Sequence, residues 1–295
     1  LVPSYTYVAT VEVIALLGLK PVFVEVYPDT FNIDIEDLEA KISDKSVAVV
    51  PVHLYGQCAD MERILKVAED HDLKVFEDTA QAIGAQFTFS DGRIAKAGTM
   101  GDAGATSFFP SKNLGAYGDG GAIMTNDDDL AAKLRMIVNH GQSKRYYHDS
   151  IGVNSRLDSI QAAILKVKLK YLDGYNEARY RVAQKYSQAF SKVGWITTPV
   201  ESNFSTHVYH QYTLKLADGV DRNGLVEHLA EKEIPSMIYY PVPNHLQRAY
   251  SYFGYKAGDM PNTEDLCSRV ISLPIHTEMS EEQQNTIIEQ VLSFR

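Results

Sequence analysis

Short apolar runs alternate with amphipathic stretches along the first half of the chain. The runs are rich in β-branched and aromatic residues and predict strands at residues 21–26, 47–52, 74–77, 105–109 and 122–125. The stretches between them have a helical period and predict helices at residues 8–17, 35–42, 61–71 and 128–138. Because strands and helices alternate, and several strands are apolar almost throughout, the pattern predicts a mostly parallel sheet covered on both faces.

A longer helical pattern follows at residues 155–190, with an interruption expected near Asp173 and Gly174. This pattern predicts the helix that connects two domains. Beyond it, the sequence predicts a strand and two further helices, at residues 209–216, 222–232 and 280–292. We therefore expect a large domain over residues 1–168, and the linking helix with a smaller α+β domain over residues 169–295.

Composition and charge argue against several classes of protein. Of the 295 residues, 45% are hydrophobic and 22% are charged, which is ordinary for a soluble globular protein. No apolar run reaches the roughly 20 residues that span a membrane, so we expect no membrane partner. The net charge of −10 argues against nucleic acid as a partner, because phosphate binding needs a basic face. Cys58 and Cys267 lie far apart and give no disulfide framework, which favours the reducing cytoplasm.

The most informative segment runs from Ser107 to Ala122. Within it, Lys112 follows an apolar run and precedes a glycine-dense turn, where a lysine has room to form a Schiff base with a flat cofactor. Upstream, Asp78 ends another apolar strand. A pyridoxal 5′-phosphate (PLP) site needs both groups, because the lysine binds the aldehyde and the carboxylate keeps the pyridine nitrogen protonated. Taken alone, such a lysine is more often a solvated turn residue, and Asp78 is also suited to cap the next helix.

Two other kinds of site are less well supported. The glycines of residues 115–121 lack the Gly-x-Gly-x-x-Gly register and precede a strand, which argues against a nicotinamide-dependent dehydrogenase. We expect them instead to give the lysine loop positive-φ freedom. The histidines lack paired ligand spacing, so we expect no metal; His207 and His210, at the start of a strand, should point to opposite faces.

Several blocks of residues carry a resemblance to a known family. They are residues 51–57, 77–81, 107–121, 140–141, 152–158, 239–241 and 245–246. In this order they make the chain resemble the DegT/DnrJ/StrS family of PLP-dependent nucleotide-sugar aminotransferases over essentially its whole length. The resemblance implies the aspartate-aminotransferase fold (fold type I), an α/β three-layer sandwich with a mostly parallel sheet and a smaller α+β C-terminal domain.

The first residues of the chain match an interior part of that family. In its members, a longer segment precedes the part that corresponds to Leu1. It includes a turn that grips the cofactor phosphate and an aromatic or histidine residue that stacks on the ring. We therefore expect the sequence to be N-terminally truncated and to lack that part of its active site.

The resemblance also implies roles for the residues that match. Lys112 is expected to bind the cofactor and to act as general base, which requires that burial lower its pKa. Asp78 is expected to pair with the pyridine nitrogen, Gln81 to lie beside the phenolic oxygen, and Ser107 to bind the phosphate. Pattern alone leaves Gln81 as a solvated helix residue and Ser107 as a strand-end hydroxyl.

Asn154 matches a residue that reaches the cofactor phosphate of the neighbouring subunit. The resemblance therefore implies a homodimer with shared active sites. The alternative from the sequence pattern is that Asn154 caps a helix beginning near Leu157, and one loop can serve both purposes.

Residues 140–148 are the main basic and aromatic cluster of this acidic chain. We expect them to meet an anionic substrate, such as the diphosphate of a nucleotide sugar; a solvated loop is the alternative. The candidate substrate-binding residues are His140, Lys144, Arg145, Arg156, Tyr240 and His245. The last two match a segment that lines the family's sugar pocket, although tyrosines there are also suited to packing.

The resemblance favours transamination of a keto nucleotide sugar with glutamate as the amino donor. Residues 152–158 and the basic run before them are similar to members that aminate C3. We therefore expect a UDP-2-acetamido-3-keto-glucuronate-type substrate, used for surface polysaccharide such as lipopolysaccharide. The alternatives are an enzyme that acts at C4 or on a dTDP-keto sugar, and a PLP-binding regulator without turnover.

Overall fold

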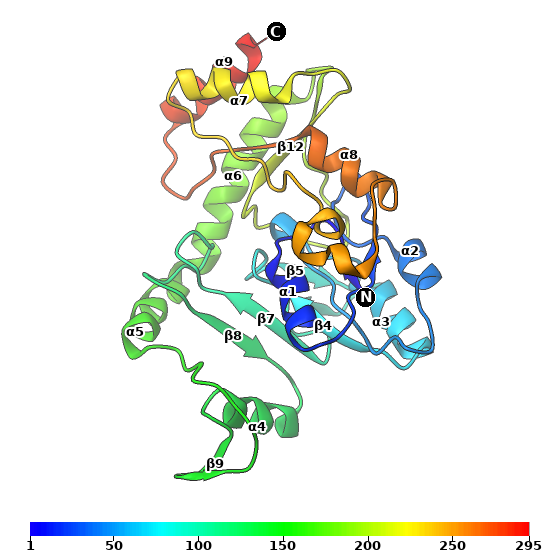
Figure 1. The fold of residues 1–295 in the computed structure, drawn as a ribbon. Coiled ribbons are helices and arrows are strands. Elements are labelled where there is room, and N and C mark those ends of the chain that lie inside the picture. The colour runs from blue at the N-terminus through cyan, green and yellow to red at the C-terminus, as the bar shows by residue number, and fades with distance from the viewer. Residues whose placement is uncertain (295) are drawn as a thin grey trace.

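The central sheet of the larger domain has the strand order β3-β4-β7-β8. Its strands are β3 (Ala48–Val49), β4 (Lys74–Asp78), β7 (Ala103–Ser107) and β8 (Gly121–Met124). The first three are parallel, and β8 runs antiparallel to β7. The computed structural model, which describes residues 1–294, thus has the mostly parallel sheet that the apolar runs predicted (Figure 1).

A second parallel pair, β1 (Val2–Pro3) with β2 (Phe23–Val24), lies alongside β3. The amino group of Leu1 donates to the Ala48 carbonyl at 2.7 Å, and Val50 N donates to the Leu1 carbonyl at 2.9 Å. Both predicted strands of this region, β2 and β3, are confirmed, although each has a regular ladder of only 2 residues.

Aspartate side chains fix the starts of three helices in the larger domain. The helices of this part are α1 (Ala9–Leu16), α2 (Ile35–Ala40), α3 (Met61–Asp70) and α4 (Asp128–Ile137). Asp34, Asp60 and Asp127 each accept a hydrogen bond from a first-turn backbone N–H of α2, α3 and α4, which would otherwise lack a partner in the helix. The sequence predicted all four helices, with ends that differ by only one or two residues.

The core of the larger domain lies between α2, α3 and the sheet. Leu38 of α2 and Ile64 of α3 are fully buried in one cluster with Val49 and Val75 of the sheet. Phe87 joins this cluster from β5 (Gln86–Thr88), which pairs with β6 (Ile94–Lys96) in an antiparallel hairpin that the pattern did not predict.

The linking helix consists of α5 (Ser159–Lys168) and α6 (Leu172–Phe190), joined by a 3₁₀ turn at Leu169–Tyr171. The helix is therefore interrupted close to the expected place, at Leu169–Tyr171, but Asp173 and Gly174 themselves lie within α6. A Cβ added at Gly174 would meet no atom within 4 Å, so the glycine occupies an open face. Its cost in a helix, about 1 kcal/mol, is outweighed by the buried residues along the rest of α6.

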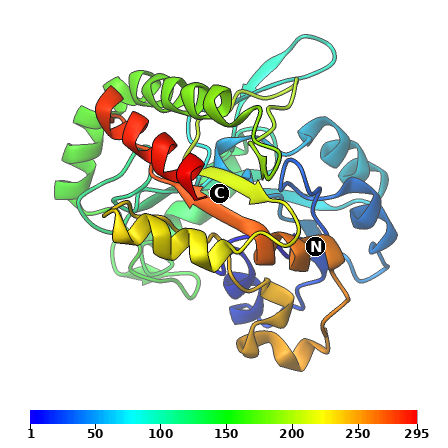
Figure 2. The ribbon, with the colours of Figure 1, turned by 90° about the horizontal axis from the view of Figure 1, so that it is seen from above.

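The smaller domain is built on an antiparallel sheet with the order β11-β12-β13. Its elements are β11 (Ile196–Thr197), β12 (Tyr212–Leu216), β13 (Val270–Leu273), α7 (Arg222–Glu231) and α9 (Glu281–Ser293). Figure 2 shows α6, α7 and α9 beside this sheet. Phe190, Leu214, Leu229, Ile271 and Val291 are buried in one cluster that these elements share. The predicted β12, α7 and α9 are confirmed, although β12 begins at Tyr212 rather than at residue 209.

The chain between α7 and β13 returns to the first strands. It contains 3₁₀ turns at Asn244–Leu246 and Arg248–Phe253, followed by α8 (Pro261–Arg269). Tyr250 packs with Val2 and Phe23, and Figure 1 shows the orange segment of these turns close to the N-terminus. Part of the second half of the sequence thus completes the core around β1 and β2, while the division into domains at residues 168 and 169 stays a prediction.

A short hairpin of β9 (Gln142–Lys144) and β10 (Tyr147–His148) follows α4. It lies at the end of the molecule opposite α9 (Figure 1). Within residues 1–294, the structure contains no helix whose length and hydropathy would let it cross a membrane.

Candidate active site

Asp78 lies at the carboxyl end of β4, where both oxygens of its half-buried side chain accept hydrogen bonds. Thr10 of α1 donates through Oγ1 to Oδ2 at 2.6 Å, and Ala80 N donates to Oδ1 at 3.0 Å. The backbone at this point is held by Val52, which pairs with Asp78 beyond the regular ladder. The carboxylate is therefore fixed at the carboxyl ends of the parallel strands, where ligands bind in open α/β sheets.

Lys112 stands on the turn after β7, close to this carboxylate. Its backbone N–H donates to the Phe109 carbonyl at 2.9 Å, and its side chain is half-buried. Burial lowers the pKa of the Lys112 amine below its usual value, and the charge of Asp78 acts in the opposite direction. Lys112 and Asp78 thus lie near enough to interact electrostatically, and their roles toward a cofactor stay predictions.

The glycines after Lys112 serve close packing rather than an unusual backbone conformation. Gly115, Gly118, Gly120 and Gly121 are absent from the positive-φ positions, so that expectation is wrong. A Cβ at Gly115 would lie 2.3 Å from the Pro110 carbonyl oxygen, inside the lysine turn itself. Only a residue without a side chain lets the loop close this tightly on the lysine turn.

Gln81 is buried and has hydrogen bonds at both ends of its amide. Its Oε1 accepts from Tyr55 N at 2.7 Å, and its Nε2 donates to the Tyr240 hydroxyl at 3.0 Å. Burial raises the pKa of Tyr240, and the nearby charge of Asp78 adds to this shift. The solvated alternative for Gln81 is therefore wrong, and the structure brings Gln81 and Tyr240 together beside Asp78.

Sequence reasoning missed two residues of this group, Thr10 and Tyr7. Thr10 donates to Asp78, as described above, and Tyr7 is a 58% exposed ring whose centroid lies 6.1 Å from that of Tyr240. An aromatic residue at the site therefore exists in the chain, although we expected it only in a preceding segment. In the sequence, the only signal is a tyrosine directly before the predicted helix of residues 8–17, and that pattern gives no reason to place it near Asp78.

Ser107 and His245 occupy different surroundings. Ser107 ends β7, half-buried, and its Oγ accepts from Phe109 N at 3.2 Å at the start of the lysine turn. His245 is 1% exposed, with Nδ1 2.7 Å from Ser4 Oγ and Nε2 3.1 Å from Glu264 Oε1. Burial lowers the pKa of His245, and Glu264 opposes that shift. Both ring nitrogens of His245 thus have protein partners.

The other predicted site residues form a separate, exposed group around the hairpin and the loop that follows it. These are His140, Lys144, Arg145, Asn154 and Arg156. Within residues 1–294, no hydrogen bond or ion pair joins any of them to Asp78, Gln81, Lys112 or Tyr240. Lys144 and Arg145 instead lie over the rings of Tyr147 and Tyr146. The structure therefore divides the predicted site into two parts.

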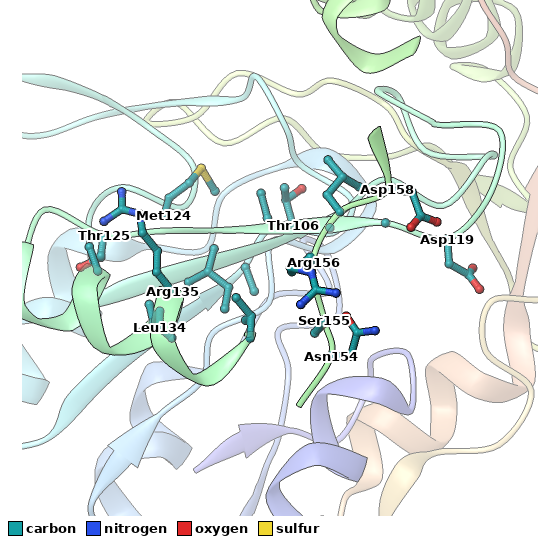
Figure 3. Close-up of a pocket in the computed structure, with 18 residues that line it drawn as sticks. Thr106, Asp119, Met124, Thr125, Leu134, Arg135, Asn154, Ser155, Arg156 and Asp158 are labelled. Atoms are coloured by element: carbon teal, nitrogen blue, oxygen red, sulfur yellow. The ribbon is translucent and has the colours of Figure 1, made fainter. Parts of the chain in front are cut away.

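Asn154 pairs with Asn139 in an isolated antiparallel bridge. Because α5 begins at Ser159 with Asp158 at its N-cap position, the alternative of Asn154 as a helix cap is wrong. Asn154 and Arg156 line an open cavity of about 890 Å³ together with β7, β8 and α4. Figure 3 shows both residues on the loop, with Arg135 of α4 across the cavity. Asp119 and Gly120, at the end of the lysine loop, also line it, whereas Lys112 and Asp78 do not.

His207 and His210 do not lie on opposite faces of a strand, because β12 begins only at Tyr212. His207 stacks on Tyr209 with 3.8 Å between the ring centroids, while His210 lies 3.2 Å from Asn113 Oδ1 through its Nδ1. Among residues 1–294, the structure contains no group of three or more His, Cys, Asp or Glu side chains with the geometry to hold a metal ion.

Comparisons with known proteins place this arrangement in a family. The sequence model of the DegT/DnrJ/EryC1/StrS aminotransferase family matches residues 1–292. A pleiotropic regulatory protein of Geobacillus stearothermophilus is 47% identical over 99% of this chain and 77% of its own length. The UDP-2-acetamido-2-deoxy-3-oxo-D-glucuronate aminotransferase of Pseudomonas aeruginosa is 42% identical over 93% of this chain and 73% of its own length.

Solved structures agree with this assignment. The crystal structure of a DegT/DnrJ/EryC1/StrS aminotransferase from Brucella abortus superposes with a TM-score of 0.92 at 41% identity, over 99% of this chain and 78% of that one. The predicted aspartate-aminotransferase fold is thereby confirmed. From its sequence and its fold, this chain belongs to the DegT/DnrJ/EryC1/StrS aminotransferase family.

Proposed function

We propose that this protein is a PLP-dependent aminotransferase that acts on a keto nucleotide sugar, with Lys112 as the lysine that binds the cofactor. The observation that carries the proposal is that the charge of Asp78, at the carboxyl end of β4, acts on the half-buried amine of Lys112, in a chain of an aminotransferase family. Family members depend on PLP. The donor set fits this cofactor, since it combines an amine of lowered pKa, a fixed carboxylate and a buried amide.

Besides Lys112, three residues would hold PLP in this arrangement. Asp78, oriented by Thr10, would face the pyridine nitrogen, and Gln81 would lie near the phenolic oxygen with the Nε2 proton that Tyr240 leaves free. Ser107 would bind the phosphate through its hydroxyl. When bound, PLP supplies an electron-accepting ring that makes the hydrogen at the substrate carbon acidic.

Lys112 is suited to move that proton. A general base must be partly neutral near the working pH, and burial lowers the pKa of the Lys112 amine in this direction. The charge of Asp78 raises the pKa of the amine and so acts against the effect of burial. The half-buried position of Lys112 also reduces the access of water to this exchange.

We propose that the second group of predicted residues acts from a partner subunit of a homodimer. Asn154, Arg156, His140, Lys144 and Arg145 are exposed and lie apart from Lys112 within one subunit. Basic side chains of this kind suit the diphosphate of a nucleotide sugar. They form a positively charged region in a chain whose net charge is −10. A two-fold arrangement would let each subunit complete the other's site. His245 stays a prediction as a sugar-pocket residue.

For the substrate we propose a UDP-linked 3-keto sugar of the 2-acetamido-glucuronate type, with glutamate as amino donor and the cytoplasm as location. Relatives named for amination of UDP-linked 3-keto sugars support this, at 42% and 41% identity. A dTDP-linked 3-keto sugar is the alternative, because a transaminase named for a dTDP-linked 3-amino sugar is 43% identical. The Geobacillus relative bears a regulatory name, so a PLP-binding regulator without turnover is the second candidate function.

A product assay separates these candidates. The protein is incubated with PLP, glutamate and either a UDP- or a dTDP-linked 3-keto sugar, and the amino sugar is measured by mass spectrometry. We expect amination of the UDP sugar, none by the Lys112→Ala variant, and slower turnover of the dTDP sugar. Preference for the dTDP sugar would overturn the substrate class, and failure to aminate any keto sugar while PLP is bound would favour the regulator.

A further inference from the structure

Asn113, the residue after Lys112, has all of its side-chain hydrogen-bonding groups engaged. Its Nδ2 lies 2.9 Å from the Val208 carbonyl oxygen and 2.8 Å from Asn176 Oδ1. A carbonyl oxygen can only accept, so the atom that faces Val208 must be the amide nitrogen rather than the oxygen. The orientation of the Asn113 amide is therefore fixed by the backbone.

The same argument fixes Asn176 of α6. Its Nδ2 donates to the Ile83 carbonyl at 3.1 Å, so its Oδ1 is the atom that accepts from Asn113. Both protons of Asn113 Nδ2 are then used. Asn113 Oδ1 is left as an acceptor, and it lies 3.2 Å from His210 Nδ1.

This geometry determines the tautomer of His210. Because Asn113 Oδ1 cannot donate, His210 Nδ1 must carry the proton of this hydrogen bond. His210 is 5% exposed, and burial lowers its pKa well below the usual value, with the charges of Lys112 and Arg179 adding to the shift. The ring is therefore neutral, with its proton on Nδ1.

The surroundings of His210 join three parts of the fold to the lysine turn. Its backbone N–H donates to the Tyr55 carbonyl at 2.8 Å, and Tyr55 N in turn donates to Gln81. Its carbonyl oxygen lies 3.3 Å from Nη1 of Arg179, one turn after Asn176 on α6. The charge of Asp78 from β4 acts on Lys112, and the charges of Lys112 and of Arg179 from α6 act on His210.

We propose that His210 is a positioning residue for Lys112: its Nδ1–H donates to Asn113 and holds the lysine turn against the segment before β12, while the neutral ring adds no charge beside the amine. This inference deepens the proposed function, since it rests on Lys112 as the cofactor-binding lysine. It adds the requirement that the turn be anchored from the linking helix and from the segment before β12, both outside the central sheet.

The tautomer can be measured without any variant. Nitrogen-15 spectra of the ¹⁵N-histidine-labelled protein, recorded from pH 6 to 8, distinguish Nδ1–H from Nε2–H and from the charged ring. Two other buried histidines provide internal references with the opposite tautomer. Nδ1 of His53 accepts from Ala59 N, and Nδ1 of His207 accepts from Tyr209 N. We expect Nδ1–H for His210 and Nε2–H for the other two; an Nε2–H or charged His210 would overturn the proposal.

The positioning role is tested on Lys112 itself in cofactor-free protein. The rate of reductive methylation of Lys112, followed by peptide mass spectrometry against pH, gives the pKa of its amine. In His210→Gln the amide no longer reaches the Nδ1 position, so the turn should loosen and the pKa of Lys112 should rise by about one unit as water enters. Two variants serve as controls. In His210→Asn the side-chain amide still places a donor near the position of Nδ1. In His207→Gln a buried histidine outside the lysine turn is replaced.

The variants give a clear decision. We expect the Lys112 pKa of the parent protein in His210→Asn and His207→Gln, and the raised value only in His210→Gln. A parental pKa in His210→Gln, or the same raised pKa in His210→Asn, would overturn the proposal. If His210→Gln does not fold, the tautomer measurement and His210→Asn still decide. None of these readouts involves PLP, so they can fail while Lys112 remains the cofactor lysine, and they can succeed if it is not.

Discussion

Thr10 and Asp78 are separated by 68 positions in the sequence, yet Thr10 Oγ1 donates a 2.6 Å hydrogen bond to Asp78 Oδ2. This bond joins the first helix of the chain to the end of β4 and orients the carboxylate. Asp78 is therefore presented to a ligand in one orientation, with the second oxygen held by the backbone of Ala80.

Removing the Thr10 hydroxyl should weaken PLP binding. In Thr10→Val the shape of the side chain is kept, but the carboxylate loses a hydrogen bond worth about 1.5 kcal/mol, so we expect roughly tenfold lower affinity. Absorbance titration with PLP measures this. Thr10→Ser keeps the hydroxyl and is the matched control, and Thr10→Val protein with parental affinity would show that Thr10 does not orient Asp78 for the cofactor.

Replacing Asp78 should change the titration of Lys112. The negative charge of Asp78 raises the pKa of Lys112 against the effect of burial. In Asp78→Asn that opposing charge is gone, so the pKa of Lys112 should fall further, by about one unit. The pH dependence of reductive methylation of Lys112 in the cofactor-free protein reports it, with the exposed Asp119→Asn as control. An unchanged or higher Lys112 pKa in Asp78→Asn would contradict the pairing.

Glu77, next to Asp78, is a buried structural carboxylate. Its oxygens accept from His53 Nε2 at 2.9 Å and from the backbone N–H groups of Gly98, Met100 and Gly101. Glu77→Gln puts an amide against these donors, and we expect the free energy of unfolding to fall by roughly 3 kcal/mol. Urea unfolding at pH 7 measures this change. A fall of less than about 1 kcal/mol in the free energy of unfolding would contradict this role.

The contribution of Glu77 should also depend on pH. Burial by itself raises the pKa of Glu77, but His53 and the backbone donors outweigh it, so the pKa lies below its ordinary value of 4.5. A carboxyl whose pKa is lower in the folded state stabilises the fold above the unfolded value and loses this effect as pH falls through the folded value. The stability difference between parent and Glu77→Gln should therefore shrink as the pH falls below 4.5. A difference that stays constant over that acidic range would argue against this role.

Local sequence patterns predicted more of the fold than of the site. Helices such as α3 could be predicted because an aspartate cap precedes a clear apolar period. The strand β13 was missed because it follows α8 directly, without turn residues to separate the two. Gly174 was taken for a break because its position on an open helix face is set by tertiary packing, which the sequence pattern does not contain.

Within the site, the reactive residues could be predicted from their sequence context, but the residues that contact them could not. Lys112 and Asp78 follow apolar strands and could be proposed from the sequence. Thr10 is an ordinary residue of a short helix, and only the fold brings it to Asp78. The glycines of the lysine loop were recognised, but their reason is the close approach of Gly115 to Pro110, which depends on how the loop closes.

The shared-site homodimer can be tested by mixing inactive variants. Lys112→Ala should lack the cofactor lysine, and Asn154→Ala should lack the contact that we assign to the partner's phosphate site, so each should be inactive or weak alone. After subunit exchange, heterodimers would contain one intact site, and about a quarter of the parental activity should return. Circular dichroism should show that Asn154→Ala is folded. If no activity returns although exchange is demonstrated, the site is not shared.

The central claim is most directly tested by the absorption spectrum of the purified protein with PLP, before and after glutamate is added. We expect a visible band from the lysine-bound cofactor, absent in Lys112→Ala, which glutamate converts to the shorter-wavelength band of the aminated cofactor. A protein that forms no such band, or keeps the band in Lys112→Ala, or ignores glutamate, would contradict an aminotransferase centred on Lys112.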